Sequence, residues 1–383
     1  MSELDDVLAA LAASGGGGGE GVALATVVAA RGSTYRRAGA RLVVPSGGEP
    51  VGNISGGCLE GDVVQTAAEV LASGRPRLLH FDLTADDEVV WGWGLGCNGV
   101  IEVLVEPAAN ALASVAALQA ARREHRPLAL VTVLDGDNLG TRLVVHPDGR
   151  TEGGLGDPHL DQVAGEQGLE GLARGTSQTH ELGSTAVRAL VEVLQPPLRL
   201  VVCGAGHDAI PLVAAGAGLG WRVEVVDDRP GFLTPERFPG AQRLVRAEPA
   251  QAAQVAGADG STYAVVMSHN FLRDQDYLHS FVAGDLAYLG VLGPRARLRQ
   301  LLDGLAAEGV VPTPEVLERV YGPAGLDIGA EGPEEIAWSI TAEILSVSRR
   351  TRAGFLRDRS GPIHPTPTPH ATPAAEPHAT TVS

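Results

Sequence analysis

The sequence predicts a two-domain α/β protein. Its amino-terminal α/β domain contains a duplicated strand–loop–helix unit, and its carboxyl-terminal domain has a doubly wound parallel sheet. Three observations lead to this prediction. The 383 residues suit two to three domains at roughly 150 residues each. The segment 41–60 is repeated at 142–161. After residue 196, apolar strand-like segments alternate with helical ones, as in parallel α/β sheets.

The amino-terminal domain, expected at 1–195, begins with a helix over 3–13 in which leucine and valine recur at helical spacing. Further strands are expected at 22–28, 41–44 and 100–105, and further helices at 60–72 and 111–124. On the helix at 60–72, Val63, Ala67 and Val70 form one apolar stripe.

The repeat aligns Arg41-Leu-Val-Val44 with Arg142-Leu-Val-Val145, and seven of the twenty positions in 41–60 are identical in the second copy. The second copy has His159 where the first has Cys58, and Asp-Pro where the first has Gly56-Gly57. If one scaffold tolerates the loss of Gly-Gly-Cys, that loop in the first copy serves chemistry rather than architecture.

The carboxyl-terminal domain, expected at 196–350, follows the stiff segment Gln195-Pro-Pro197. Its expected strands lie at 198–203, 222–226, 242–245, 263–267 and 287–292, and its helices at 207–218, 274–282, 295–306 and 333–350. The last helix has proline and two glutamates in its first turn, which suit a helix start. A Pro-, Thr- and His-rich tail at 351–383 is expected to be disordered.

Composition and charge exclude several classes of protein. Hydrophobic residues make up 44% of the chain and aromatic residues only 4%, so we expect cores of Ala, Val and Leu. A net charge of −17 argues against nucleic acid or a polybasic membrane surface as partner, because both need cationic faces. All 29 basic residues are arginine, which excludes a Walker-type phosphate loop and Schiff-base chemistry.

Cysteine usage and the first residues predict a cytoplasmic protein. Cys58, Cys97 and Cys203 are too few for a disulfide framework. The first residues are acidic and lack the basic region of a secretory signal. No apolar stretch reaches the roughly 18 residues of a membrane span.

The first candidate site is the loop Gly52-Asn-Ile-Ser-Gly-Gly-Cys-Leu-Glu60, which includes Ser55, Gly56, Gly57 and Cys58. Consecutive glycines allow backbone N–H groups to form an anion-binding concavity. Cys58 directly precedes a predicted helix, whose positive end stabilises a thiolate. A tight turn with a small buried cysteine is the alternative.

A second glycine-rich loop, Trp91-Gly-Trp-Gly-Leu-Gly-Cys-Asn-Gly99, also centres on a cysteine, Cys97. Two such loops in one domain suggest thiolates that face one ligand. Trp91 and Trp93 are placed either to cover a flat ring or to pack in a core. Two cysteines do not make a structural zinc site, which needs four ligands.

A third motif, Gly204-Ala-Gly206-His207-Asp-Ala209, follows an apolar strand and opens a helix, as a dinucleotide-binding loop does. Asp227 ends the next strand, where an acid holds ribose hydroxyls. Asp208 counts against binding, because it adds a negative charge where a pyrophosphate would lie. Cys203 ends the first strand and is expected in the core.

His207, His269 and Arg295 follow strands of the same predicted sheet. In doubly wound sheets the ligand crevice lies at the carboxyl ends of the strands, so these three side chains are expected to converge there. Each of them alone is equally compatible with a helix cap or an ordinary surface position.

Taken together, these motifs resemble the XdhC/CoxI family, the maturation factors of molybdenum hydroxylases such as xanthine dehydrogenase. The resemblance extends to about residue 350. The motifs on which it rests are Ser55-Gly-Gly-Cys-Leu-Glu60, Gly94-Leu-Gly-Cys97, Gly204-Ala-Gly-His207, Val226-Asp-Asp-Arg229, Tyr288-Leu-Gly-Val-Leu-Gly293 and Gly325-Leu-Asp-Ile-Gly-Ala-Glu331. The sequence departs from the family pattern at Asp208, at Asn98 and at Ser268-His269-Asn270.

The resemblance implies a non-catalytic carrier of molybdenum cofactor (molybdopterin). Such a protein protects the cofactor, assists its sulfuration by a cysteine desulfurase, and delivers it to an apo-hydroxylase of the xanthine dehydrogenase type. It also implies a Rossmann-like carboxyl-terminal domain. Soft thiolates at Cys58 and Cys97 would face the molybdenum. We further expect a homo-oligomer.

Two other functions are compatible with the residues. One is an NAD(P)-dependent oxidoreductase that uses the Gly204 loop, and the other is a nucleotide-sensing scaffold in which the cysteine loops are only turns. Bound pterin, turnover of NAD(H), or bound nucleotide without pterin would separate the three.

Overall fold

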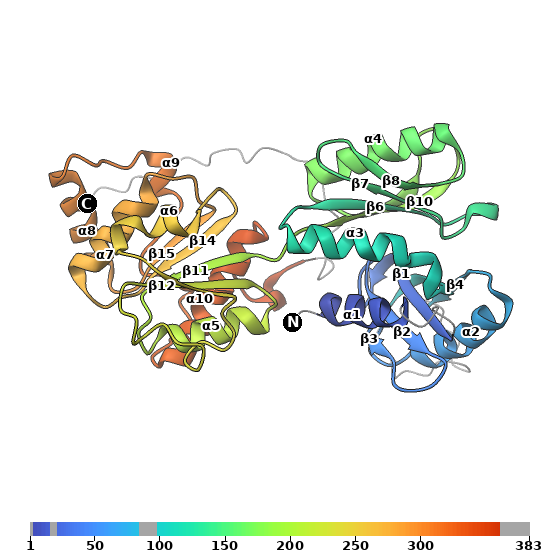
Figure 1. The fold of residues 1–383 in the computed structure, drawn as a ribbon, viewed down its shortest axis with the longest axis horizontal. Helices are drawn as coiled ribbons and strands as arrows, with labels where there is room; N and C mark the ends of the chain where they lie inside the picture. Colours follow the sequence, from blue (N-terminus) through green and yellow to red (C-terminus); the bar gives the residue numbers. More distant parts are fainter. Residues whose placement is uncertain (1–2, 16–20, 84–97, 361–383) are drawn as a thin grey trace. The chain divides into compact units, whose positions relative to one another are not determined.

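The computed structural model of the chain describes residues 3–15, 21–83 and 98–360 (Figure 1). These residues form two compact units, one of residues 3–196 and one of residues 197–355. The boundary falls within the Gln195-Pro-Pro197 segment. None of the described helices is long and apolar enough to cross a membrane.

The amino-terminal unit contains two five-stranded antiparallel sheets with the same strand order, β3-β2-β1-β5-β4 and β8-β7-β6-β10-β9. The first copy comprises α1 (Glu3–Gly15), β1 (Val22–Ser33), β2 (Arg41–Pro45), β3 (Val51–Gly52), α2 (Glu60–Ser73), β4 (Arg77–Asp82) and β5 (Asn98–Pro107). The second comprises α3 (Leu112–Arg123), β6 (Leu128–Val133), β7 (Arg142–Val145), β8 (Thr151–Gly154), α4 (Pro158–Arg174), β9 (Gln178–Glu181) and β10 (Arg188–Leu194). The predicted duplication is therefore confirmed.

The register of the strands shows how closely the two copies correspond. Arg41 on β2 pairs with Thr26 on β1, and Arg142 on β7 pairs with Thr132 on β6. The sequence alignment of these two arginines is thus also a structural one. In the first copy, the predicted stripe on α2 is buried against the sheet.

Two reciprocal buried ion pairs join the copies. Arg41 of the first copy donates to Glu192 on β10 of the second, through Nη1 at 2.8 Å and Nη2 at 2.5 Å. Arg142 of the second copy pairs in the same way with Glu106 on β5 of the first. Each arginine also donates to the carbonyl two residues before it, at 2.8 Å for Arg41 and 2.9 Å for Arg142. The amino-terminal unit is therefore one domain with internal two-fold similarity.

The carboxyl-terminal unit is a six-stranded parallel sheet in the order β13-β12-β11-β14-β15-β16, with helices on both faces. Its strands are β11 (Arg199–Cys203), β12 (Arg222–Asp227), β13 (Arg243–Arg246), β14 (Thr262–Val266), β15 (Tyr288–Val291) and β16 (Val320–Tyr321). Its helices are α5 (Ala209–Gly218), α6 (Ala252–Ala256), α7 (Phe271–Val282), α8 (Arg295–Ala307), α9 (Pro314–Leu317) and α10 (Pro333–Ser348). The order reverses between β11 and β14, which is the Rossmann-like arrangement, and ligands of such sheets bind at that reversal.

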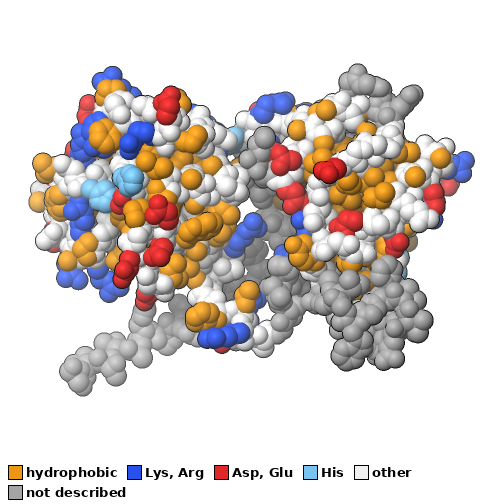
Figure 2. Space-filling view, turned by 90° about the horizontal axis from the view of Figure 1, so that it is seen from below, with side chains coloured by type: hydrophobic (Ala, Val, Ile, Leu, Met, Phe, Trp, Pro, Cys, Tyr) orange, Lys and Arg blue, Asp and Glu red, His pale blue; other side chains and the backbone are white. Residues whose placement is uncertain are grey.

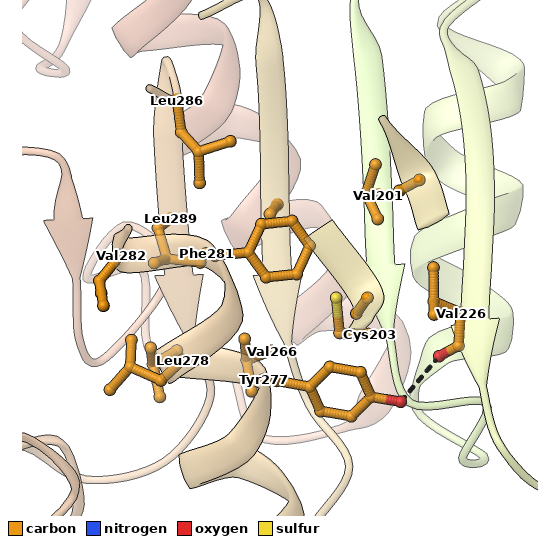
Figure 3. Close-up of a cluster of buried hydrophobic side chains, with 14 of the residues drawn as sticks. Val201, Cys203, Val226, Val266, Tyr277, Leu278, Phe281, Val282, Leu286 and Leu289 are labelled. Atoms are coloured by element: carbon orange, nitrogen blue, oxygen red, sulfur yellow. Dashed lines mark hydrogen bonds between the residues drawn. The ribbon is translucent and has the colours of Figure 1, made fainter. Parts of the chain in front are cut away.

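Alternate residues of β11 face the two hydrophobic cores of this unit. Leu200 and Val202 pack with α5 and α10, whereas Val201 and Cys203 pack with α7 and α8. Figure 3 shows Cys203 in the second of these cores, beside Tyr277, whose hydroxyl donates to the carbonyl of Val226 at 3.2 Å. Burial, with a smaller contribution from the charge of Asp274, raises the pKa of the Cys203 thiol. The prediction that Cys203 is a core residue is confirmed.

The arginines on one face of the molecule are not gathered in one place (Figure 2). On the face drawn in Figure 2, the described arginines are scattered between acidic and apolar side chains and form no continuous basic area.

Candidate functional site

The loop of residues 52–60, called the Cys58 loop below, is organised by the buried hydroxyl of Ser55. Its oxygen accepts hydrogen bonds from the backbone N–H groups of residues 57, 58 and 59 at 3.1, 3.1 and 3.2 Å. The hydroxyl donates to the carboxylate of Glu60, which also accepts the N–H of Ser55 at 3.1 Å. These three N–H groups are therefore engaged within the loop, contrary to the expected anion-binding concavity. A phosphate group bound near this loop would therefore need a positively charged partner outside the loop.

Cys58 is half-buried and precedes α2 by two residues. Its side chain packs against the core that contains Val63 and Ala67. The helix begins at Glu60, where the sequence predicts it, so the thiol lies before the positive end of a helix dipole. Its partial exposure distinguishes Cys58 from the fully buried Cys203.

The second cysteine loop lies outside the described residues, together with Trp91, Trp93 and Cys97. β5 begins directly after it, at Asn98, which pairs with Ser33 on β1. A shared site of Cys58 and Cys97 stays a prediction.

The second copy shows what the same loop looks like without a cysteine. The side chain of Asp157 caps α4, because its Oδ1 accepts the N–H groups of His159 and Leu160 at 2.7 and 3.2 Å. His159, the counterpart of Cys58, is exposed. The scaffold therefore starts a helix here with or without the Ser-Gly-Gly-Cys sequence, which supports a functional reason for that sequence.

Tyr35 lies beside the Cys58 loop, although none of the motifs found in the sequence includes it. A Cβ atom added to Gly56 would lie 3.8 Å from Tyr35 Cδ2. The tyrosine is 62% exposed and also lines a surface pocket of about 490 Å³ together with Arg36 and Arg37. The repeat itself held the signal, because its second copy lacks this aromatic and basic group.

In the carboxyl-terminal unit, the Gly204 loop closely approaches the loop after β14. Gly204 has φ +107°, and a Cβ there would lie 2.7 Å from the Cα of Ser268. Only glycine therefore fits at this position. The contact lies where the strand order reverses, as a dinucleotide-binding motif requires.

Two of the departures from the family pattern contact each other at this reversal. His269 Nε2 lies 2.9 Å from Asp208 Oδ2, so an ion pair or hydrogen bond links the start of α5 to the loop after β14. His269 has a backbone φ of +58°, which is uncommon outside glycine. The pair occupies the helix terminus that would meet a pyrophosphate.

Asp227, the expected ribose-binding acid, is fully buried and already has partners. Its carboxylate accepts the N–H of Ala205 at 2.7 Å and three donors of Arg229 at 2.7 to 2.9 Å. Burial acts to raise the pKa of Asp227, but the Arg229 side chain and the two backbone N–H groups together lower it to about 2. The carboxylate thus fixes the Gly204 loop from within the protein.

Of the three residues His207, His269 and Arg295, His269 contacts Asp208, and the convergence of all three side chains stays a prediction. His207 and Arg295 are exposed, and within residues 98–360 neither pairs with a carboxylate. Arg297, two residues further along α8, donates to the buried carboxylate of Asp274 at 2.7 Å. Asp274 in turn accepts the hydroxyl of Ser268 at 2.5 Å.

Within the described parts of the chain, no group of three or more His, Cys, Asp or Glu side chains is arranged to hold a metal ion. A metal bound through these residues would therefore have at most two of them as ligands, and its other ligands would come with it.

Comparisons with protein families match both units. Residues 17–82 and 121–183 match the XdhC and CoxI family, and these two segments fall one in each copy of the repeat. Residues 200–344 match the XdhC Rossmann domain.

Individual proteins are similar over most of the chain. A Bacillus subtilis (strain 168) protein described as a probable xanthine dehydrogenase subunit is 31% identical over 335 residues, which cover 86% of this chain and 94% of that protein. The molybdenum cofactor insertion chaperone PaoD of Escherichia coli (strain K12) is 24% identical over 328 residues, with 86% and 84% covered. A crystal structure of a Bacillus halodurans protein described as a xanthine dehydrogenase has a TM-score of 0.75 at 29% identity and covers 92% of this chain and 97% of its own.

Proposed function

The chain belongs to the XdhC and CoxI family, and from this premise we propose that it carries molybdenum cofactor to an apo-hydroxylase of the xanthine dehydrogenase type. The cofactor is its cargo. A cysteine desulfurase is the proposed source of sulfur for the cofactor, and the cytoplasm is the proposed compartment. We also propose that the carrier acts as a homo-oligomer.

The observation that carries this proposal is the divergence of the two copies at the Cys58 loop. Both copies keep the sheet, the glycine turn and the following helix, but only the first places a half-buried thiol before that helix. A thiolate is a soft ligand that suits a metal held by sulfur. Similarity to a cofactor insertion chaperone supports the same use of this domain.

The residues present fit the cargo in part. Cys58 supplies a sulfur ligand at an accessible position, and Cys97 is its proposed partner. The glycines at 56 and 57 leave the face of the loop free of side chains. The engaged amides of residues 57 to 59 do not fit a phosphate, so that group needs a cationic side chain.

The alternative function, an NAD(P)-dependent oxidoreductase, has less support from the geometry. Asp208 with His269 occupies the start of α5, and Asp227 is engaged by Arg229. Both features oppose a dinucleotide at Gly204 and Gly206. We therefore propose that this unit has a structural or docking role, with dinucleotide binding as the second candidate.

Analysis of the ligands bound to the full chain tests the proposal. The protein is purified without oxygen from cells that make molybdenum cofactor, and bound pterin is converted to its fluorescent oxidised form. We expect pterin to be recovered with the protein, and we expect the chain to raise the yield of active hydroxylase from apo-enzyme, cofactor and a sulfur source. NAD(H) turnover without bound pterin would support the oxidoreductase instead.

A further inference from the structure

The two copies of the amino-terminal unit diverge most clearly where two loops meet. In each copy, the loop before the second strand lies against the loop before the long helix. In the first copy, a Cβ atom added to Gly56 would lie 3.8 Å from Tyr35, and in the second, a Cβ atom added to Gly156, the counterpart of Ser55, would lie 3.3 Å from Asn138. The same architecture thus presents two different sets of side chains.

The difference is one of charge and aromatic character. The first copy has Tyr35-Arg36-Arg37 at the positions where the second has Gly136-Asp137-Asn138. Two cations and a ring are replaced by an acid, an amide and a glycine. The loops also differ in backbone, since Gly136–Asn138 forms a 3-10 turn and residues 35–37 do not, whereas the sheets around them have the same strand order.

Each copy also has a pocket beside this loop, and the two pockets correspond in the residues just before the second strand of the copy; β10 lines part of the first pocket and β8 lines part of the second. Gly39 and Arg41 line the pocket of about 490 Å³ in the first copy, and their counterparts Gly140 and Arg142 line one of about 470 Å³ in the second. Both volumes lie within the usual range for small-molecule sites. The pockets therefore differ in lining rather than in size.

Among the described residues, ion pairing engages two of the three arginines that line the first pocket. Arg36 is bound by Glu3 through two hydrogen bonds of 2.8 and 2.9 Å, and Arg41 is bound by Glu192. Arg37 is exposed, and among the residues that the structure describes no carboxylate pairs with it. In the second pocket, the one arginine, Arg142, is bound by Glu106. A guanidinium that no described carboxylate engages can anchor an anion in a chain whose net charge is −17.

We propose that the first pocket binds a phosphorylated, flat heterocycle, with Arg37 on the phosphate and Tyr35 against the ring. This inference rests on the proposed function, in which the ligand is the pterin of the molybdenum cofactor. Arg37 supplies the positive partner that the Cys58 loop lacks, since Ser55 occupies the amides of that loop. Tyr35 is exposed and free to stack, and its contact with Gly56 connects the pocket to the loop that holds Cys58.

The test is direct binding of pterin phosphate to the full chain. The probe is oxidised pterin released from a molybdenum hydroxylase, with and without phosphatase treatment, and binding is followed by fluorescence. Arg37→Gln should weaken binding of the phosphorylated probe about tenfold or more, and should have no effect on the dephosphorylated probe. Tyr35→Ala should weaken binding of both probes several-fold, and Tyr35→Phe should not.

Controls separate this inference from the proposed function. Asn138→Ala, in the second copy, should leave binding unchanged, and thermal unfolding should show that Arg37→Gln is folded. Equal binding of the phosphorylated probe by Arg37→Gln and wild type would overturn the pocket assignment, while cofactor retention by wild type would leave the carrier function standing. Equal binding of the phosphorylated and dephosphorylated probes by the wild type would also overturn it. Absence of pterin and cofactor from every preparation would instead refute the proposed function.

Discussion

Replacing Glu192 by glutamine is expected to destabilise the amino-terminal unit strongly, because it leaves a buried guanidinium without its counter-charge. The side chains of Arg41 and Glu192 are only 6% and 7% exposed. Arg41 donates to both carboxylate oxygens. Glutamine has the same shape but offers a single acceptor, and its amino group would face the guanidinium.

The magnitude follows from burial. Breaking a buried ion pair by removing one partner costs about 3 to 5 kcal/mol. Arg41 keeps its bond to the carbonyl of Gly39 and feels the charge of Glu106, so we expect a loss of about 3 kcal/mol, at the lower end. The exposed pair of Arg77 and Glu69, with side chains 51% and 52% exposed, should be worth less than about 1 kcal/mol.

Native-state hydrogen exchange of the full chain measures this difference, because peptides from β1, β5 and β6 report the opening of the amino-terminal unit. Peptides from the other unit are the internal reference. Arg77→Gln is the matched control, and the double variant Arg41→Met with Glu192→Leu should recover much of the loss. A cost for Glu192→Gln no larger than that for Arg77→Gln would refute the reasoning.

Three further results are expected. Asp227 contributes stability above pH ~4 that is lost as the pH falls toward its folded pKa of about 2. Asp227→Asn should therefore reduce the loss of stability of the carboxyl-terminal unit between these pH values, and an unchanged pH dependence of unfolding would contradict the Arg229 contact. Asp208→Asn should tighten any NAD(H) binding seen by calorimetry, since it removes a negative charge at the start of α5. Unchanged NAD(H) affinity, or tighter binding of the 2′-phosphorylated cofactor, would mean that the Gly204 loop is not a dinucleotide site. The purified chain alone should oxidise no purine, because a purine hydroxylase needs iron–sulfur clusters with four cysteines each and this chain has three in all. Steady hypoxanthine oxidation, free of contaminating hydroxylase, would overturn the carrier assignment.

Local patterns in the sequence were sufficient for much of the fold. Helical spacing predicted α1 and α2, and alternation of apolar segments predicted the parallel sheet of the second unit. The alignment of Arg41 with Arg142 predicted the duplication. The short strands β3, β8 and β16 were not predicted, because two to four residues carry too little periodicity.

The contacts of the candidate sites were harder to predict, because they join distant parts of the chain. Arg41 and Glu192 are 151 residues apart, and no local pattern connects them. Asp208 and His269 each stood out in the sequence, but their pairing depends on the neighbouring positions of β11 and β14. Ser55 and Glu60 are only five residues apart, but their hydrogen bond does not have the three-residue spacing of a capping box, and the N-cap position of α2 is Leu59.

The most direct test of the central claim is the amount of molybdenum cofactor that the full chain retains when one thiol is removed. Cys58→Ala and His159→Ala change equivalent positions of the two copies, so the second is a matched control for the first. After anaerobic loading and gel filtration, we expect that His159→Ala keeps the wild-type content of pterin and molybdenum and that Cys58→Ala loses most of it. Equal retention by the two variants would contradict the claim that the first copy holds the cargo through Cys58.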